Sequence, residues 1–149
     1  MEKLSIPIFH MERKTIRGFR NVDEFIDNVK DKEIYLVDAP TFRGRHINFK
    51  ILSRLSAIYG VWYDGNLRWK DDVSDILLSG AKIAVLSGKK INDDFISKIL
   101  SITENVALKS DDEEMLLKFR NLGGRIAITN IFLDGLLLYR MDGGRLVEL

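Results

Sequence analysis

The chain has 149 residues, of which 46% are hydrophobic, and this length suits one domain covering residues 1–149. Its 23 basic and 22 acidic residues leave a net charge of +1, so bulk charge predicts neither nucleic acid nor a membrane as a partner. Cysteine is absent, which excludes disulfides and thiolate metal sites, and no apolar run approaches the roughly 18 residues of a membrane span. We therefore expect a cytoplasmic protein.

Short apolar runs of strand length recur along the chain. We interpret each as continuous rather than alternating, which is typical of a parallel strand covered on both faces. Six such runs are predicted as strands, at residues 4–9, 33–38, 60–64, 82–87, 105–110 and 125–130.

Helical spacing fills the segments between these runs, and several segments carry start and stop signals. Asn21, Asn48 and Asn92 each stand where a helix cap is expected. A fourth helix is predicted over residues 69–78, and a fifth opens with a Ser110/Glu113 capping box and stops at Gly123 and Gly124.

Strand and helix thus alternate, which predicts βα units and a parallel sheet. Residues 136–149 break this pattern, because two short apolar runs flank Asp142-Gly143-Gly144, a turn signal typical of a β-hairpin. We expect an α/β fold built as a barrel-like sheet truncated to six βα strands plus that hairpin. A doubly wound open sheet is the alternative.

Polar residues end successive predicted strands at a nearly regular interval. In parallel α/β folds the ligand crevice lies at the carboxyl ends of the strands, so these residues are candidates for one site. They are Asp38, Asp64, Ser87, Ser110 and Asn130.

Three stretches resemble a known family: IPIFHM, YLVDAPTFRGRHINFKILSRL and YDGNLRWKDDVSDILLSGAKIAVLSGKKINDDFISKI. In order and spacing they are similar to the (β/α)8 phosphoribosyl isomerases and cyclases of histidine biosynthesis, above all the ribotide isomerase. The resemblance covers residues 5–135, with Val37-Asp38, Gly44 and Asn48 matching family positions after the second strand.

The resemblance implies where catalytic residues would stand. The family's first catalytic aspartate falls at His10 here and its second falls at Lys109, while Asp38 is kept. An imidazole can act as a base near neutral pH, and a desolvated lysine can form a Schiff base with a carbonyl. His10, Lys109 and Asp38 are therefore the catalytic candidates if the protein is an active isomerase.

Phosphate binding is the second implication. The family's glycine-rich phosphate turn corresponds to Asp64-Gly65-Asn66-Leu67-Arg68, and the next loop carries Ser87-Gly88-Lys89. Backbone N–H groups and cationic side chains suit an anion here. The phosphate-binding candidates are Asp64, Gly65, Asn66, Arg68, Ser87, Gly88, Lys89 and Asn130. Ordinary turn and cap roles remain open for them.

No cofactor is expected. His10 and His46 with Asp38 and Asp64 have no spacing that indicates a metal site. Because both catalytic aspartates are replaced, we expect a divergent, catalytically altered relative that binds a phosphorylated sugar, a ribotide-like ligand or a partner protein. The alternative is an active sugar-phosphate isomerase using His10 and Lys109.

Chain length predicts the oligomeric state. Eight βα units need about 200 to 250 residues, so this chain is too short for a closed barrel of that kind. An incomplete barrel would leave an exposed sheet edge. We therefore expect a homo-oligomer whose interface includes residues 136–149.

Overall fold

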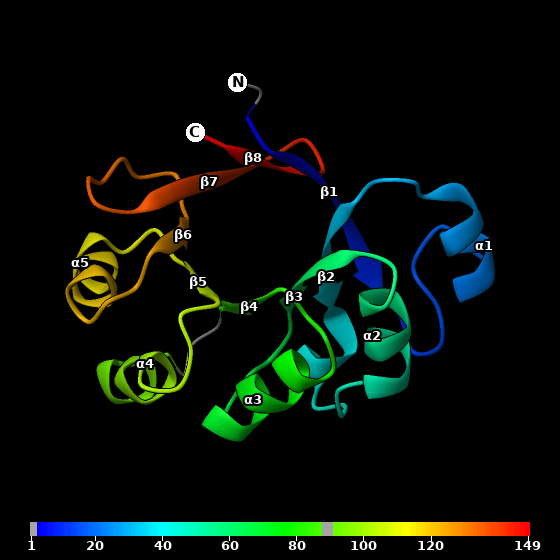
Figure 1. Cartoon of the computed structure of the whole chain (residues 1–149), viewed down its shortest axis with the longest axis horizontal. Coiled ribbons are helices and arrows are strands. Elements are labelled where there is room, and N and C mark those ends of the chain that lie inside the picture. The colour runs from blue at the N-terminus through cyan, green and yellow to red at the C-terminus, as the bar shows by residue number, and fades with distance from the viewer. Residues whose placement is uncertain (1–2, 88–90) are drawn as a thin grey trace.

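A computed structural model describes residues 3–87 and 91–149, and its strands form a closed barrel (Figure 1). The barrel strands are β1 (Ser5–Met11), β2 (Glu33–Asp38), β3 (Gly60–Asp64), β4 (Ile83–Leu86), β5 (Val106–Lys109), β6 (Ile126–Ile128), β7 (Leu137–Asp142) and β8 (Arg145–Glu148). The helices are α1 (Val22–Asn28), η1 (Ala39–Arg43, a 3-10 helix), α2 (Phe49–Ser56), α3 (Lys70–Leu78), α4 (Asp93–Leu100) and α5 (Glu113–Asn121).

Strands β1 to β7 run parallel, each paired with the next along the chain. Strand β8 runs antiparallel to both of its neighbours. It pairs with β7 through Tyr139 opposite Glu148 and with β1 through Ser5 opposite Val147. Every described strand therefore has two partners, and the sheet has no edge.

This closure corrects the expected fold class. The chain is neither a sheet truncated to six parallel strands nor a doubly wound open sheet, because eight strands join in one closed mixed barrel. The TIM-barrel interpretation is also wrong: one strand is antiparallel, and five α-helices occur within the described ranges. The physical reason is that the C-terminal hairpin supplies two barrel strands without a helix between them.

Two apolar layers make up the core. The barrel interior is a packed plug rather than a pore, in which Trp62 and Tyr139 meet edge to face at 5.0 Å. The second layer lies between the barrel and its helices, where Phe25, Leu52 and Phe119 are fully covered. Residues that fill the plug are Ile6, Tyr35, Trp62, Ile83, Val85, Ala107, Ile128, Tyr139 and Leu146.

The helices cover only part of the barrel wall. Figure 1 shows α1 to α5 along the outside of the wall from β1 to β6, whereas β7 and β8 have no helix outside them. The outward side chains of this helix-free face include Ser5, Arg140 and Arg145, which are exposed. Because these outward side chains are polar, this face of the barrel can contact solvent without a covering helix.

The helix caps confirm most of the sequence prediction. The side chains of Asn21, Asn48 and Asn92 accept hydrogen bonds from backbone N–H groups at the starts of α1, α2 and α4. The expected Ser110/Glu113 box is wrong, since the Asp112 side chain caps α5 instead.

The oligomer interface was expected because an open sheet edge would be exposed. That reason no longer applies, because residues 136–149 complete the barrel of their own chain. As for membranes, a helix of the length and apolarity needed for crossing does not occur in the described part of the chain.

Truncating Leu146 should test the closure. Its side chain is 0% exposed inside the barrel, so Leu146→Ala should lower the free energy of unfolding by about 2–5 kcal/mol in urea titrations. Val147 points outward from the same strand, and Val147→Ala should cost roughly 1 kcal/mol or less. Equal losses from both variants would contradict a β8 that closes the barrel with Leu146 inside.

Candidate active site at the barrel mouth

Parallel pairing places the carboxyl ends of β1 to β7 at one end of the barrel, which we call the mouth. Side chains alternate along each strand, so those two residues beyond an interior residue also face inward. On this basis His10 follows Ile8, Asp64 follows Trp62, and Lys109 follows Ala107. The strand positions of all three residues thus direct their side chains to the interior side of the mouth.

Asp64 is the centre of the mouth. The residue is only 2% exposed, yet both of its carboxylate oxygens have donors. The Tyr35 hydroxyl donates to Oδ2 over 2.6 Å and the Ser87 hydroxyl donates to Oδ1 over 2.6 Å. The Lys109 ammonium lies 3.3 Å from Oδ2. Four strands, β2 to β5, therefore meet through this one carboxylate.

The same cluster stands directly on the apolar plug. Burial raises the pKa of the Tyr35 hydroxyl well above its usual value, and the neighbouring Asp64 charge acts in the same direction, so Tyr35 serves as a donor. Burying a carboxylate and its partners stabilises a fold poorly compared with apolar packing. A group of this kind at the open end of a barrel is more typical of a functional site.

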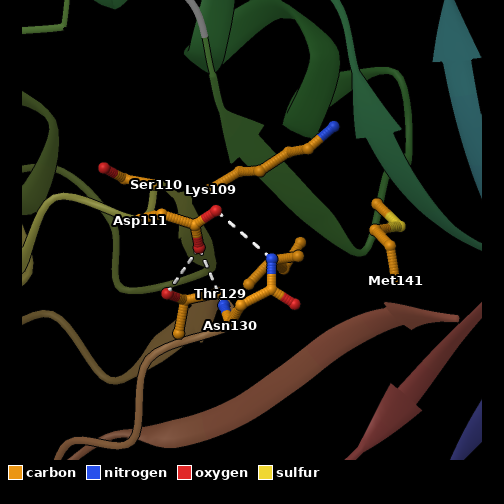
Figure 2. Close-up of a pocket in the computed structure, with 7 residues that line it drawn as sticks. Lys109, Ser110, Asp111, Thr129, Asn130 and Met141 are labelled. Carbon is orange, nitrogen blue, oxygen red and sulfur yellow. Dashed lines mark hydrogen bonds between the residues drawn. The ribbon is translucent and has the colours of Figure 1, made fainter.

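A pocket of about 250 Å³ opens beside the cluster (Figure 2). The Lys109 side chain runs along it away from Asp111, and Met141 lies on the opposite side. Its lining residues are Lys109, Ser110, Asp111, Ile128, Thr129, Asn130 and Met141. The pocket thus combines an ammonium group with hydroxyl, amide and carboxylate groups.

Asp111 organises the far side of this pocket. It accepts the Thr129 hydroxyl over 3.0 Å and both the backbone and side-chain N–H groups of Asn130 over 2.8 and 3.2 Å. The Asn130 backbone donor is the main reason that the pKa of Asp111 falls below its usual value. Asn130 is therefore held in place by a carboxylate that the sequence prediction did not select.

Asp38 does not join the Asp64 cluster. Its neighbour Val37 belongs with the interior residues, so the Asp38 side chain lies on the outer side of β2, where it is 2% exposed. There the Tyr63 hydroxyl donates to it over 2.5 Å. Burial raises the pKa of Asp38, although that hydrogen bond opposes the shift. The catalytic candidates His10, Lys109 and Asp38 are thus divided between two sides of the barrel wall.

The predicted phosphate loop has few free donors. The Asn66 backbone N–H donates to the Thr41 hydroxyl over 2.8 Å, and those of Arg68 and Trp69 both donate to the Asp72 carboxylate. The Arg68 guanidinium lies against the Asn66 side chain. Gly65 has another role, since a Cβ there would stand 2.5 Å from the Tyr63 hydroxyl. Gly88 and Lys89 lie outside the described residues.

Among the described residues, neither histidine takes part in the hydrogen bonds of the Asp64 cluster. His10 is exposed, and its imidazole makes no hydrogen bond to any residue in the described ranges. Over that same part of the chain, no group of His, Asp and Glu side chains is arranged to hold a metal ion.

Sequence analysis missed Tyr35 and Asp111. Tyr35 lies in a continuous apolar run, so nothing in the pattern separates its polar role from core packing. Asp111 stands before a helix, where an acid normally interacts with the helix dipole. Asn130, which follows the next strand, could have indicated a polar partner for Asp111.

Asp38 predicts a distinctive pH dependence. Its pKa is raised on folding, so between about pH 4 and that raised value the folded chain binds more protons than the unfolded chain. Its contribution to stability therefore falls as pH rises. Asp38→Asn keeps an acceptor for Tyr63 and should remove this fall in urea titrations between pH 3 and 7. A slope unchanged in the variant would contradict the assignment.

Asp111→Asn is the matched control. Because the pKa of Asp111 is lowered, its contribution grows as pH rises toward the usual carboxyl range, and the variant should lose stability at neutral pH.

Comparison with known proteins adds no assignment. No protein-family model matches the chain, and no curated protein matches it either. The resemblance to ribotide isomerases therefore depends on the order and spacing of its motifs, and the function has to be inferred from the geometry of the mouth.

Proposed function

We propose that the mouth binds a small phosphorylated sugar or ribotide-like compound, and that Lys109 is the group that contacts its anionic or carbonyl oxygen. The observation that carries this proposal is the Lys109–Asp64 ion pair above the apolar plug. In this proposal the chain is a divergent relative of the ribotide isomerases of histidine biosynthesis, altered at both catalytic positions.

Lys109 is suited to bind a ligand because, among the described residues, its ammonium has Asp64 as its one side-chain partner. An ammonium group has three N–H donors, and Asp64 occupies one direction at 3.3 Å. The Lys109 side chain is 40% exposed while that of Asp64 is 3% exposed. The carboxylate thus anchors the ammonium, and the Lys109 side chain lines the pocket.

The rest of the pocket suits hydroxyl groups. Asp111 offers carboxylate acceptors, and the Asn130 carbonyl oxygen and Ser110 hydroxyl add further polar groups. A negative Asp111 disfavours a phosphate next to it, so the phosphate belongs on the Lys109 side. A polyhydroxylated compound with one anionic end fits both halves.

Binding is favoured over turnover. The family reaction uses two carboxylates as acid and base, whereas Asp64 already accepts from three donors and Asp38 bonds to Tyr63 outside the interior. An active isomerase remains the second candidate, because the strand register directs both His10 and Lys109 to the mouth.

A thermal-shift panel tests the proposal. Inorganic phosphate, ribose 5-phosphate and the ribotide substrate of the isomerase family would each be added to the full chain. A bound compound at 100 times its dissociation constant stabilises by about 2.7 kcal/mol, which corresponds to a Tm rise of roughly 5 °C or more. Turnover of the ribotide would be followed in the same samples.

For any compound that raises the Tm, Lys109→Met should weaken the affinity by about tenfold or more, because it removes a charged donor. Lys82→Met is the matched control: Lys82 forms a similar pair with Glu33 at 2.6 Å on the opposite end of the barrel. Affinity that is unchanged in Lys109→Met, or no shift with any phosphorylated compound, would contradict the proposal.

A further inference from the structure

Cationic side chains gather on one sector of the mouth, over the loops that follow β1, β2 and β3. We call this set the basic rim: Arg13, Lys14, Arg45 and Arg68, with the His46 imidazole among them. Hydrogen bonds tie its loops together. The Asn48 side chain donates to the Arg13 carbonyl over 3.2 Å, and the Asn66 N–H donates to the Thr41 hydroxyl over 2.8 Å. The rim is therefore one surface.

These cations are not neutralised by the acids around them. Among the described residues, the ion pairs involve no member of the basic rim. Of the neighbouring acids, Glu12 pairs with Arg17, Asp38 is buried, and Asp72 accepts the N–H groups at the start of α3. Asp75 lines one end of the surface, and Asp71 shares a hollow with Arg68 and Trp69. A positive sector thus exists on a chain whose net charge is +1.

The surface is hollowed on both sides of one loop segment. A hollow of about 500 Å³ reaches from Glu12 and Arg13 to Asn48, and one of about 340 Å³ reaches from Thr41 to Trp69. Arg45, His46, Ile47 and Phe49 line both. The hollows are therefore neighbours along a single cationic track.

Two aromatic rings are exposed along this track. Phe49 is 38% exposed between the hollows, and Trp69 is 69% exposed at the start of α3. Among the described residues, Trp69 belongs to neither apolar cluster of the core. Large aromatic faces left in solvent beside unpaired cations are the combination used to stack bases and hold the phosphates of single strands.

We propose that the basic rim binds single-stranded nucleic acid, with phosphates on Arg13, Arg45 and their neighbours and bases stacked on Trp69 and Phe49. Charge complementarity selects a polyanion, and the exposed rings select one that carries flat bases. This site is distinct from the Lys109 pocket, whose lining it does not share. The near-zero net charge of the whole chain does not reveal such a local group of basic side chains.

Tryptophan fluorescence gives a direct measurement. Trp62 is 2% exposed inside the barrel, so quenching on addition of a 20-nucleotide oligo(U) or oligo(dT) would report on Trp69. The association constant should fall with salt, with a slope of about −0.7 in log K against log salt concentration for each phosphate contact. Trp69→Leu should weaken binding about fivefold or more. The two oligomers distinguish RNA from DNA.

Charge-matched double variants locate the site. Arg13→Ala/Arg45→Ala should weaken oligonucleotide binding at least tenfold and reduce the salt slope, as expected for lost phosphate contacts. Arg125→Ala/Arg140→Ala removes two exposed cations outside the rim and should leave binding unchanged. Lys109→Met should also leave it unchanged, which separates this proposal from that for the mouth.

Three results would overturn the proposal. They are no quenching at low salt, equal losses from the two double variants, and binding of uridine monophosphate or an acidic peptide as tightly as the 20-mer. The last result would assign the basic rim to a small phosphorylated compound or a protein instead.

Discussion

The structure depends on the backbone pairing of β8 between β7 and β1. Through it the first and last strands of the chain lie side by side, with Ser5 opposite Val147 and the Leu4 carbonyl accepting the Glu148 N–H. Without β8 the sheet would expose two edges and one flank of the apolar plug. One short antiparallel strand therefore lets 149 residues enclose a barrel interior that a repeated βα unit would need many more residues to close.

Closure also defines the mouth. With β1 to β7 parallel, the loops that follow β1 to β6 gather at one end, and the turn between β7 and β8 joins them. The interior below is filled by rings such as Tyr35, Trp62 and Tyr139, so the pocket at the mouth lies above a packed core. Above the apolar plug, the side chains of Tyr35, Ser87 and Lys109 contact the Asp64 carboxylate. This carboxylate therefore holds the Lys109 ammonium at the mouth.

Much of the local structure could be predicted from the sequence. Strands β2 and β3 have the predicted bounds, and the asparagine caps begin three helices as expected. Continuous apolar runs identified these strands because both of their faces are covered. Such signals are local, and they do not depend on which strand pairs with which.

The closure could not be predicted in the same way, because it joins residues about 140 positions apart. A signal nevertheless existed. In β1, β7 and β8 the inward residues Ile6, Met141 and Leu146 alternate with outward Pro7, Arg140 and Arg145, which indicates a wall with one solvated face. The segment at 4–9 was interpreted as continuous instead.

The site was predicted in part for a related reason. Strand ends identified Asp64 and Ser87, and the family resemblance identified Lys109; the structure brings the three together. Asp38 also ends a strand, but its place in the inward–outward alternation of β2 directs its side chain outward. This alternation can be used only when the interior side of each strand is known. Tyr35 could not be separated from the core residues around it.

An engineered disulfide tests the closure most directly, since the natural chain has no cysteine to interfere. Ser5→Cys/Val147→Cys places two thiols on facing positions of β1 and β8. Oxidation at low protein concentration should give a disulfide within one chain, detected by mass spectrometry and by a monomeric band on non-reducing gels. Disulfide-linked dimers, or thiols that stay reduced, would contradict a barrel that closes on its own C-terminal strand.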